Sequence, residues 1–297
     1  MARRRKNDKK SIIISVIAVI LIILGASTVS DKEHYASNSY SASDAYVHFI
    51  DVGQGSSTLI QVGDKGILID AGEKEYGDYV AEYINSCGIK ELECVVASHP
   101  HSDHIGGMTD VIKQYSIGEF IMPKLTEINI PTTKVYERMI DALIEKNVDV
   151  SAAEVGDRFT MDGVTMELLG PVEQSEDLND MSVICKVTVN GTEVMILGDA
   201  EKGELSSVYN KVNSDFGADI IAMGHHGSST SIHKAFLNAV GAEIAVISCG
   251  KDNSYGHPHK EALQYINSKG MTLYRTDYDG DVVFKCADGE YERVDYR

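Results

Sequence analysis

The sequence predicts a mixed α/β fold in which β-strands lie between layers of helices. From Tyr46 onward, short apolar segments that end at turn residues alternate with segments whose apolar residues recur at helical spacing. The strand-like segments fall into two groups, each mixed with helix-like segments. Two such groups favour strands sandwiched between helical layers, because each element must bury its apolar face against another. With 297 residues, 43% of them hydrophobic, the chain can bury a sizeable core.

The first group begins with three strands and contains three helices. A helix is indicated by four apolar residues from Tyr76 to Ile84 that share one side at helical spacing. Residues 93–97 (ECVVA) form a short apolar run bounded by polar residues, which is typical of a strand. The elements expected in this half are strands over 45–50, 57–62, 66–69 and 93–97, and helices over 74–86, 105–115 and 134–146.

The second group opens with a run of strands and continues with alternating helices and strands. The Asn190-Gly191 pair between two strands is a strong signal for a two-residue hairpin. Asp288-Gly289 indicates a further hairpin near the end of the chain. The elements expected in this half are strands over 158–161, 165–169, 181–189, 193–197, 219–223, 243–248 and 271–276, helices over 200–211, 232–240 and 260–269, and a last hairpin of 282–285 with 291–294.

The N-terminal 29 residues have the layout of a signal anchor or a signal peptide. Residues 1–10 hold six Lys/Arg and one Asp, and residues 12–26 are apolar except for Ser15 and Gly25. Extended over 11–29, the run is just long enough to cross a bilayer, which needs about 17–20 helical residues. We expect an uncleaved anchor with its basic flank inside and the body of the chain outside; cleavage and secretion are the alternative. Residues 30–45, polar and rich in Ser, are expected to be a flexible linker to one domain over 46–297.

Composition disfavours two kinds of partner. The whole chain has a net charge of −18, and residues 1–10 carry +5. The remaining residues therefore carry a net charge of −23. Such an acidic body disfavours avid, unspecific binding to nucleic acid, which depends on neutralising phosphates, although a local basic cleft would still allow it. The five cysteines include no CxxC pair, so a structural zinc knuckle is not indicated. They are expected to be small buried residues, with one disulfide such as Cys87–Cys94 left open.

Histidine placement is the most informative feature of the chain. Seven of the ten His fall in three short clusters, at 99–104, 225–226 and 257–259. The first cluster is His99-Pro-His101-Ser-Asp103-His104, which follows the expected strand 93–97 and precedes a helix. Imidazole and carboxylate are ligands that suit Zn²⁺ and neighbouring divalent metals. Four such donors at one turn predict a metal site.

Two later segments can contribute to the same site. Asp199 ends an expected strand, where its carboxylate can bridge two metals; alternatively it caps the helix that follows. His225 and His226 end the expected strand 219–223 between glycines, and paired histidines in that setting are seldom mere packing.

Taken in order, these segments and several others resemble the metallo-β-lactamase superfamily. The motifs are Asp51-Val-Gly53-Gln54-Gly55, Asp70-Ala71-Gly72, the 99–107 run, Leu197-Gly198-Asp199, Gly224-His225-His226-Gly227-Ser228 and Asn253-Ser-Tyr-Gly256-His257-Pro258. The first and the last two are similar to the ComEC-like branch, which comprises the C-terminal extracellular domain of ComEC competence proteins and related stand-alone hydrolases. The resemblance covers residues 46–285. It implies an αββα four-layer sandwich with a dinuclear metal site at one edge, here behind an N-terminal hydrophobic anchor.

The resemblance also implies a function for each motif residue. One metal would be held by His99 and His101, the other by Asp103, His104 and His225, with Asp199 bridging the two. Asp51 would steady the ligand loop without touching a metal. The residues expected to face substrate oxygens are His226, Ser228 and His257. The third His ligand of many members is missing, because no His lies between His104 and His225; an Asn–Ser element matched by Asn179 and Ser182 stands there, and Asn179 is expected to contact substrate.

The implied activity is metal-dependent hydrolysis by the domain over 46–297. Two divalent ions, Zn²⁺ or Mn²⁺, would lower the pKa of a bridging water to give hydroxide. Asp103 and Asp199 would hold that hydroxide, and His226 or His257 would protonate the leaving group. The expected substrate is a phosphodiester, nucleic acid included, met outside the cytoplasm at the cell membrane or after secretion. The alternatives are a small-substrate hydrolase for a phosphocholine ester, lactone or β-lactam, and a non-catalytic surface-binding module; the sequence gives no oligomeric state.

Overall fold

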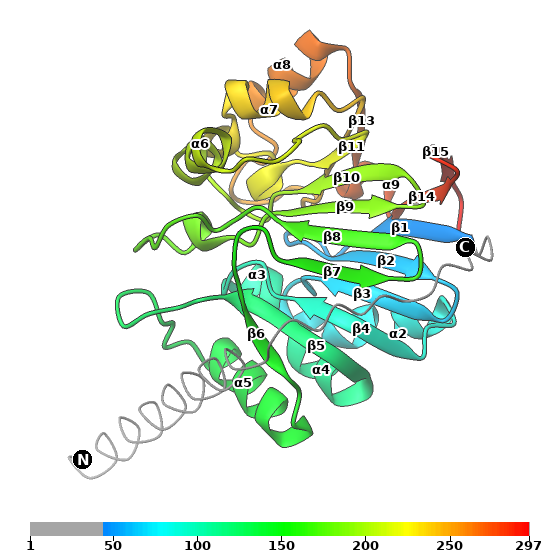
Figure 1. The fold of residues 1–297 in the computed structure, drawn as a ribbon, viewed down its shortest axis with the longest axis vertical. Helices are drawn as coiled ribbons and strands as arrows, with labels where there is room; N and C mark the ends of the chain where they lie inside the picture. The colour runs from blue at the N-terminus through cyan, green and yellow to red at the C-terminus, as the bar shows by residue number, and fades with distance from the viewer. Residues whose placement is uncertain (1–43, 297) are drawn as a thin grey trace.

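The computed structural model describes residues 44–296, which form two β-sheets packed face to face with helices on both outer sides (Figure 1). Within these residues the first sheet has eight strands, antiparallel from β15 to β3 and parallel from β3 to β6. In spatial order they are β15 (Glu290–Val294), β14 (Val282–Ala287), β1 (Ala45–Phe49), β2 (Thr58–Val62), β3 (Lys65–Ile69), β4 (Glu91–Val96), β5 (Ser116–Pro123) and β6 (Val150–Ala153).

The second sheet has seven strands in the same described range and comes entirely from the second half of the chain. Its order is β13 (Thr272–Arg275), β12 (Ile244–Ile247), β11 (Ile220–Ala222), β10 (Thr192–Ile196), β9 (Cys185–Val189), β8 (Val164–Leu168) and β7 (Arg158–Met161). The strands from β10 to β13 are parallel, and those from β7 to β10 are antiparallel. The expected hairpin between β9 and β10 is confirmed: Asn190 and Gly191 both have positive φ, as a two-residue turn of this kind requires.

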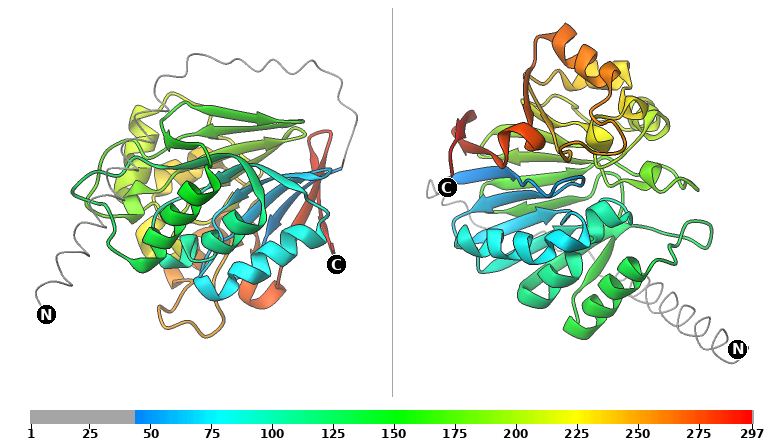
Figure 2. Two further views of the ribbon diagram at one scale, coloured as in Figure 1. Left: turned by 90° about the horizontal axis from the view of Figure 1, so that it is seen from below. Right: turned by 180° about the vertical axis from the view of Figure 1, so that it is seen from behind.

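Three apolar cores lie between the four layers, and Figure 2 shows how the layers are stacked. Strand residues alternate between two of these cores because successive side chains point to opposite faces: Leu59 packs toward the helices and Ile60 toward the other sheet. The first sheet is covered by α2 (Gly77–Ser86), α4 (Met108–Gln114) and α5 (Lys134–Lys146), and the second by α6 (Lys202–Lys211), α7 (Lys234–Val240) and α8 (Lys260–Lys269). The expected αββα sandwich is thereby confirmed.

The remaining helical turns are short. They are α3 (Ser102–Ile105), α9 (Thr276–Asp279) and the 3-10 turns η1 (Lys74–Tyr76), η2 (Asn179–Met181), η3 (Gly224–Gly227) and η4 (Ser229–Ser231). Several lie in the loops that follow strands at one edge of the sandwich.

Some expected elements differ from the structure. The helix expected over 105–115 is present as α4, but it begins later, at Met108, and is preceded by the separate turn α3. The strand over 181–189 begins only at Cys185, because η2 takes up the residues before it. Strands β5 and β6 were not expected; β5 reads SIGEFIMP, and its Gly and Pro hide the strand pattern.

Two further observations bear on the sequence expectations. All five cysteines are buried free thiols, so the disulfide left open at Cys87–Cys94 is not formed. Among residues 44–296, no helix combines the length and apolar character that a membrane crossing needs. The expected anchor over 1–29 and nearly all of the linker over 30–45 lie outside the described residues.

The two ends of the described segment lie next to each other. Strand β1 pairs with β14, so that Ala45 lies opposite Cys286. The rings of Tyr46 and Tyr296 are in edge contact, with centroids 4.8 Å apart. This junction lies at the opposite end of β1 from the strand ends that carry the histidine loops (Figure 1).

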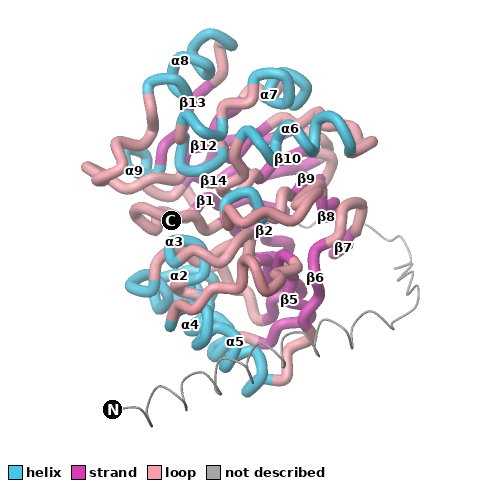
Figure 3. The backbone as a smooth tube through the Cα atoms, turned by 90° about the vertical axis from the view of Figure 1, so that its left-hand side faces the viewer, coloured by secondary structure: helices cyan, strands magenta, loops and turns pink. Residues whose placement is uncertain are grey.

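The topology brings three loops together at the other edge. Strands β4, β10 and β11 run in register with parallel neighbours, and the loops after them carry the clustered polar residues. Seen from that edge, loops lie in front of the strands between the two helical layers (Figure 3). Polar sites gather at the carboxyl ends of parallel strands in this way because the strand backbones hold the loops in fixed positions.

Candidate metal centre

The loop after β4 carries four of the predicted site residues on buried or half-buried positions. His99 and His104 are fully buried, and their ring centroids lie 4.2 Å apart. His101 turns back toward His99, with 3.0 Å between His101 Nδ1 and His99 Nε2. Asp103 and His104 sit on α3, the single helical turn that follows. The loop therefore presents two pairs of donors, 99/101 and 103/104, side by side.

Asp70, to which the sequence alone assigned no function, holds this loop through contacts with Ser98 and His104. It follows β3 with φ +61°, is buried, and accepts hydrogen bonds from the backbone N–H and the hydroxyl of Ser98 at 2.8 and 2.6 Å. Its Oδ2 lies 2.6 Å from His104 Nδ1. A carboxylate on Nδ1 fixes the imidazole orientation and leaves Nε2 as the free ligand atom, a common support for metal-binding histidines. The signal available was the Asp-Ala-Gly motif directly after a buried strand.

Asp199 reaches the same place from the second sheet. It follows β10, is buried, and its backbone N–H donates to the hydroxyl of Ser182 at 3.0 Å. Its carboxylate oxygens lie 3.1 Å from His104 Nε2, 3.8 Å from His99 Nε2 and 3.7 Å from His225 Nε2. Asp199 is therefore near donors of both predicted metal positions. Helix α6 begins at Lys202 with Glu201 at its cap position, so Asp199 is not the helix cap that was its alternative interpretation.

His225 and His226 lie on η3, where the backbone is left-handed. Their φ values are +50° and +53°, and Gly227 follows with +78°. Such conformations are costly for residues with a Cβ and persist where the surroundings impose them, often at functional sites. Both rings bring Nε2 near Asp199 Oδ2, that of His225 to 3.7 Å and that of His226 to 3.6 Å. His226 Nδ1 donates to the carbonyl of Ser248 at 2.9 Å, and its Nε2 faces Asp103 and Asp199 at 3.1 and 3.6 Å.

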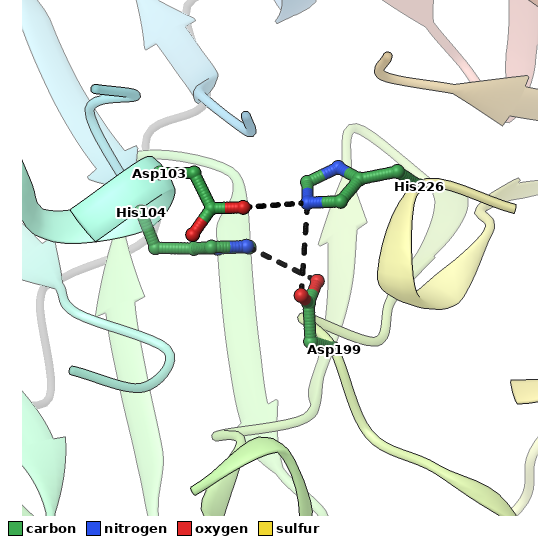
Figure 4. A group of neighbouring side chains, drawn as sticks. All are labelled: Asp103, His104, Asp199 and His226. Atoms are coloured by element: carbon green, nitrogen blue, oxygen red, sulfur yellow. Dashed lines mark hydrogen bonds and ion pairs between the residues drawn. The ribbon is translucent and has the colours of Figure 1, made fainter. Parts of the chain in front are cut away.

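Asp103, His104, Asp199 and His226 form a compact group whose ligand atoms all lie within 4.8 Å of one another (Figure 4). His104 Nε2 and Asp199 Oδ1 are buried and face each other at 3.1 Å as an ion pair, but neither atom makes a hydrogen bond of good geometry. Leaving two such atoms unsatisfied is expensive unless something else binds them. A divalent cation between imidazole nitrogens and carboxylate oxygens satisfies these atoms, so the donor set fits a metal site.

The charges of the group also favour a cation. Burial would lower the pKa of His104 and His226, but the carboxylate of Asp199, with Asp70 or Asp103, outweighs burial and raises both pKa values. Burial would raise the pKa of Asp103 and Asp199, yet the adjacent imidazoles hold both pKa values below the ordinary range. Burial and the nearby His104 lower the pKa of His99. The carboxylates thus stay ionised in a buried place, which attracts positive charge.

His225 lies at the rim of this group rather than inside it. Its side chain is 22% exposed, and its Nδ1 faces Glu201 Oε1 at 3.2 Å and Thr230 Oγ1 at 3.3 Å. The rings of His225 and His257 lie in edge contact at 5.5 Å. Burial and the neighbouring histidines lower the pKa of His257 to about 4. These two imidazoles form the open side of the candidate centre.

The other predicted residues lie farther from the compact group. Asn179 Nδ2 contacts Glu201 Oε1 at 3.5 Å, and Asn179 Oδ1 is buried without a partner. Ser228 is buried, and its hydroxyl pairs with that of Thr230. Asp51 accepts from the backbone of Gly53 and so shapes the 51–56 turn, whose Ser56 N–H donates to the carbonyl of Asp103. Asp51 acts on the ligand loop only through that turn; the direct support comes from Asp70.

Comparison with known proteins agrees with this geometry. The family model described as the Metallo-beta-lactamase superfamily matches residues 50–251. The chain belongs to this superfamily. Its members are generally metal-dependent hydrolases, and this member carries a candidate metal site of the matching donor type.

The chain is similar in sequence to competence proteins. It is 27% identical over 263 residues to "ComE operon protein 3" of Bacillus subtilis, a match covering 82% of this chain and 33% of the relative. It is 31% identical over 249 residues to "Competence protein ComA" of Neisseria gonorrhoeae, covering 83% and 33%. The chain thus spans about a third of the length of these relatives. The expected resemblance to the ComEC-like branch is confirmed.

Solved structures support the fold alone. YhfI of Bacillus subtilis superposes with a TM-score of 0.52 at 14% identity, over 82% of this chain and 100% of its own. CmlA of Streptomyces venezuelae, a diiron β-hydroxylase, superposes with a TM-score of 0.53 at 11% identity, over 86% and 55%. Proteins described as differently as these two share the sandwich, so the reaction has to be argued from the site.

Proposed function

We propose that this protein is a phosphodiesterase that uses two divalent cations and acts on nucleic acid. The observation that carries the proposal is the compact group of Asp103, His104, Asp199 and His226, which joins both halves of the chain and leaves two buried ligand atoms without a hydrogen bond. Cations held there would activate a water and stabilise the negative charge that develops on a phosphoryl oxygen. Phosphodiester hydrolysis requires both effects.

The geometry favours a changed assignment of the two adjacent histidines. The sequence predicted His225 as a ligand and His226 as a substrate contact. In the structure His226 Nε2 faces both carboxylates with its Nδ1 held by a backbone carbonyl, as is typical of a ligand. We therefore assign His226, with Asp103, His104 and Asp199, to one cation, and His99 and His101, with Asp199, to the other. Zn²⁺ and Mn²⁺ both suit these donors.

His225 and His257 are then left to act on the substrate. Both lie at the open side of the centre, and Glu201 accepts from His225 Nδ1, which orients the ring and leaves Nε2 toward the centre. From Nε2 a proton can pass to the leaving oxygen, as in general acid catalysis. The low pKa of His257 makes its imidazole neutral at pH 7, so it serves as a hydrogen-bonding group rather than a proton source.

Nucleic acid is supported as the substrate by a basic cavity beside the ligand loop. An open cavity of about 270 Å³ is lined by three basic residues, Lys74, Lys113 and Arg138, and one acidic residue, Asp110; Gly106, two residues after His104, forms part of its wall. None of the three cations makes an ion pair within residues 44–296. Unpaired cations on so acidic a body suit a phosphate of a longer strand. The names of the relatives, which refer to competence and recombination, also point to proteins that handle DNA.

The test uses the full chain, freed of metal by a chelator and then supplied with Mn²⁺ or Zn²⁺. A bis-aryl phosphate and a single-stranded DNA oligonucleotide should be hydrolysed, and a lactone and nitrocefin should not. Asp199→Ala should lower turnover by at least about 10³-fold, more than the loss of one oxyanion donor typically costs, while circular dichroism shows the protein still folded. Turnover of the lactone or nitrocefin alone would replace this function by small-substrate hydrolysis. No bound metal and no turnover would make the protein a binding module.

We further propose that the catalytic domain over 46–297 works outside the cytoplasm, held at the membrane by residues 1–29. The support is the basic cluster followed by an apolar run of spanning length. In intact cells, an added protease should cleave the domain while a cytoplasmic marker survives. Protection of the domain until lysis would contradict this location.

A further inference from the structure

Tyr255 is an exposed aromatic residue at the open side of the candidate centre. Its relative exposure is 66%, among the highest of the large apolar residues described. Its ring stacks on that of His257, with centroids 5.7 Å apart and planes 19° apart. His257 in turn lies 5.5 Å from the ring of His225 and 6.0 Å from that of His226. A single imidazole therefore separates this open aromatic face from the catalytic histidines.

The loop that carries Tyr255 is held by many hydrogen bonds. Asn253 Oδ1 accepts from the backbone N–H groups of Tyr255 and His257 at 3.2 and 3.0 Å. Asn253 Nδ2 donates to the carbonyls of Gly250 and His257 at 2.9 and 2.6 Å. His259 Nε2 bonds to the carbonyl of Tyr255 at 3.2 Å. This network fixes the backbone of the loop, and the stack on His257 positions the ring, which reduces the entropy lost when a ligand stacks on it.

The environment of Tyr255 differs from that of another exposed tyrosine. Tyr278 is 74% exposed, and its ring is covered in part by the guanidinium of Arg275 at 4.3 Å. Tyr255 has no cation over its ring among the described residues and stacks only on His257. A preordered aromatic face without a partner, next to a phosphodiester-cleaving centre, matches the stacking platforms on which proteins bind the bases of single strands.

We propose that Tyr255 binds a nucleobase next to the scissile phosphate, so that the substrate is a single-stranded nucleic acid rather than a simple phosphodiester. This inference rests on the proposed function. The base stacks on the open face of the Tyr255 ring, while the adjoining phosphate reaches the centre past His257. Because every base has a flat face, such a contact selects for the presence of a base and little for its identity.

The experiment compares two substrates with the metal-loaded full chain. One is a thymidine dinucleotide, and the other is the same molecule with the base beside the cleaved bond replaced by hydrogen. Tyr255→Ala should raise KM for the dinucleotide by about 5- to 100-fold, the range for loss of one stacked base, and leave KM for the abasic substrate as in the wild type. Tyr255→Phe should restore the wild-type KM, and Tyr255→Leu should not. Tyr278→Ala is the matched control and should change neither substrate.

Each outcome decides between explanations. Equal changes for both substrates would mean that Tyr255 only supports His257, and would overturn the proposal. Wild-type KM in Tyr255→Ala would overturn it as well. If the wild-type protein cleaves neither substrate but hydrolyses the bis-aryl phosphate, this inference fails and the proposed phosphodiesterase activity stands; if it hydrolyses none of the three, both fail. A second measurement uses 2-aminopurine in the flanking position: binding to Asp199→Ala should quench its fluorescence, and the further change Tyr255→Ala should abolish the quenching.

Discussion

The two halves of the molecule fix an imidazole of the candidate centre by different means. In the first half, His104 Nδ1 is held by the buried carboxylate of Asp70 at 2.6 Å. In the second half, His226 Nδ1 is held by the backbone carbonyl of Ser248 at 2.9 Å, and the ring is aimed by a left-handed backbone. Both arrangements leave Nε2 toward Asp199. The same chemical result is reached through a side chain in one half and through the main chain in the other.

This difference determines where each half is sensitive to mutation. A side chain can be replaced without moving the backbone, so the first half depends on the single residue Asp70. A backbone conformation depends on its neighbours, so the second half depends on residues that tolerate positive φ and on the packing around them. In the second half, the positions that support the ligand without touching it are therefore glycines, such as Gly227.

Replacing either His225 or His226 with Ala should have the largest effect on activity. We expect His226→Ala to lose bound metal, because it removes a ring that faces both carboxylates. His225→Ala should keep the metal and lower kcat by about 10²-fold or more, the usual contribution of a general acid. Metal analysis of the purified variants, together with their kcat, separates the two. The reverse pattern would restore the sequence-based assignment of His225 as the ligand.

Asp70→Asn tests the side-chain support of the first half. The amide can still accept from Ser98 but no longer carries the charge that orients His104. Loss of such a support typically lowers metal affinity or activity by about 10- to 100-fold, which competition with a fluorescent chelator would measure. Asp51→Asn is the control and should have a smaller effect, because the Asp51 carboxylate contacts only the turn at Gly53. Equal effects would contradict the direct support by Asp70.

Gly227→Ala tests the main-chain support of the second half. Gly227 has φ +78°, and a Cβ there would lie 2.7 Å from Pro258 Cβ. Gly256 has a similar φ of +74° with open space around it, so Gly256→Ala introduces the strain without the clash. We expect Gly227→Ala to lower the free energy of unfolding by about 1–3 kcal/mol more than the control, as for other overpacked sites. Urea unfolding of both variants gives the difference; similar values would show that packing around Gly227 is loose.

Removing positive charge from the basic cavity should have the smallest effect on activity. It should leave the metal-binding residues of both halves unchanged. Lys113→Gln with Arg138→Gln should raise KM for an oligonucleotide and reduce the slope of log KM against log salt by about 1 for each phosphate that the protein no longer neutralises. The KM for a bis-aryl phosphate should not change. Lys146→Gln is the control, because it lies on α5 like Arg138 but does not line the cavity. An unchanged salt slope would exclude this cavity from substrate binding.

How far the sequence could predict this molecule depends on how local each feature is. Motifs that lie within a few residues, such as 99–104 or the hairpin at Asn190-Gly191, were recognised because spacing alone defines them. Strand β5 was missed because its Gly and Pro obscure an otherwise apolar run whose burial comes from the sheet. The hydrogen bonds of Asp70 are made with residues 28 and 34 positions away, which no local pattern reveals.

The adjacent histidines show a second limit. Spacing identifies His225 and His226 as a pair, but which of them faces Asp103 is decided by φ angles that are unusual for histidine. Those angles result from the loop around them, including the approach of Pro258 to Gly227. The side-chain directions at such a site can be known only once the whole loop is folded.

The edge contact between Tyr46 and Tyr296 makes this domain suitable for circular permutation. A linker of a few residues can join positions 44 and 296 without disturbing β1 or β14. New termini can then be opened at an exposed turn such as Gly156. A host protein, resin or sensor module could be attached at the junction between positions 44 and 296. It would lie away from the histidine loops and would not block substrate from reaching them.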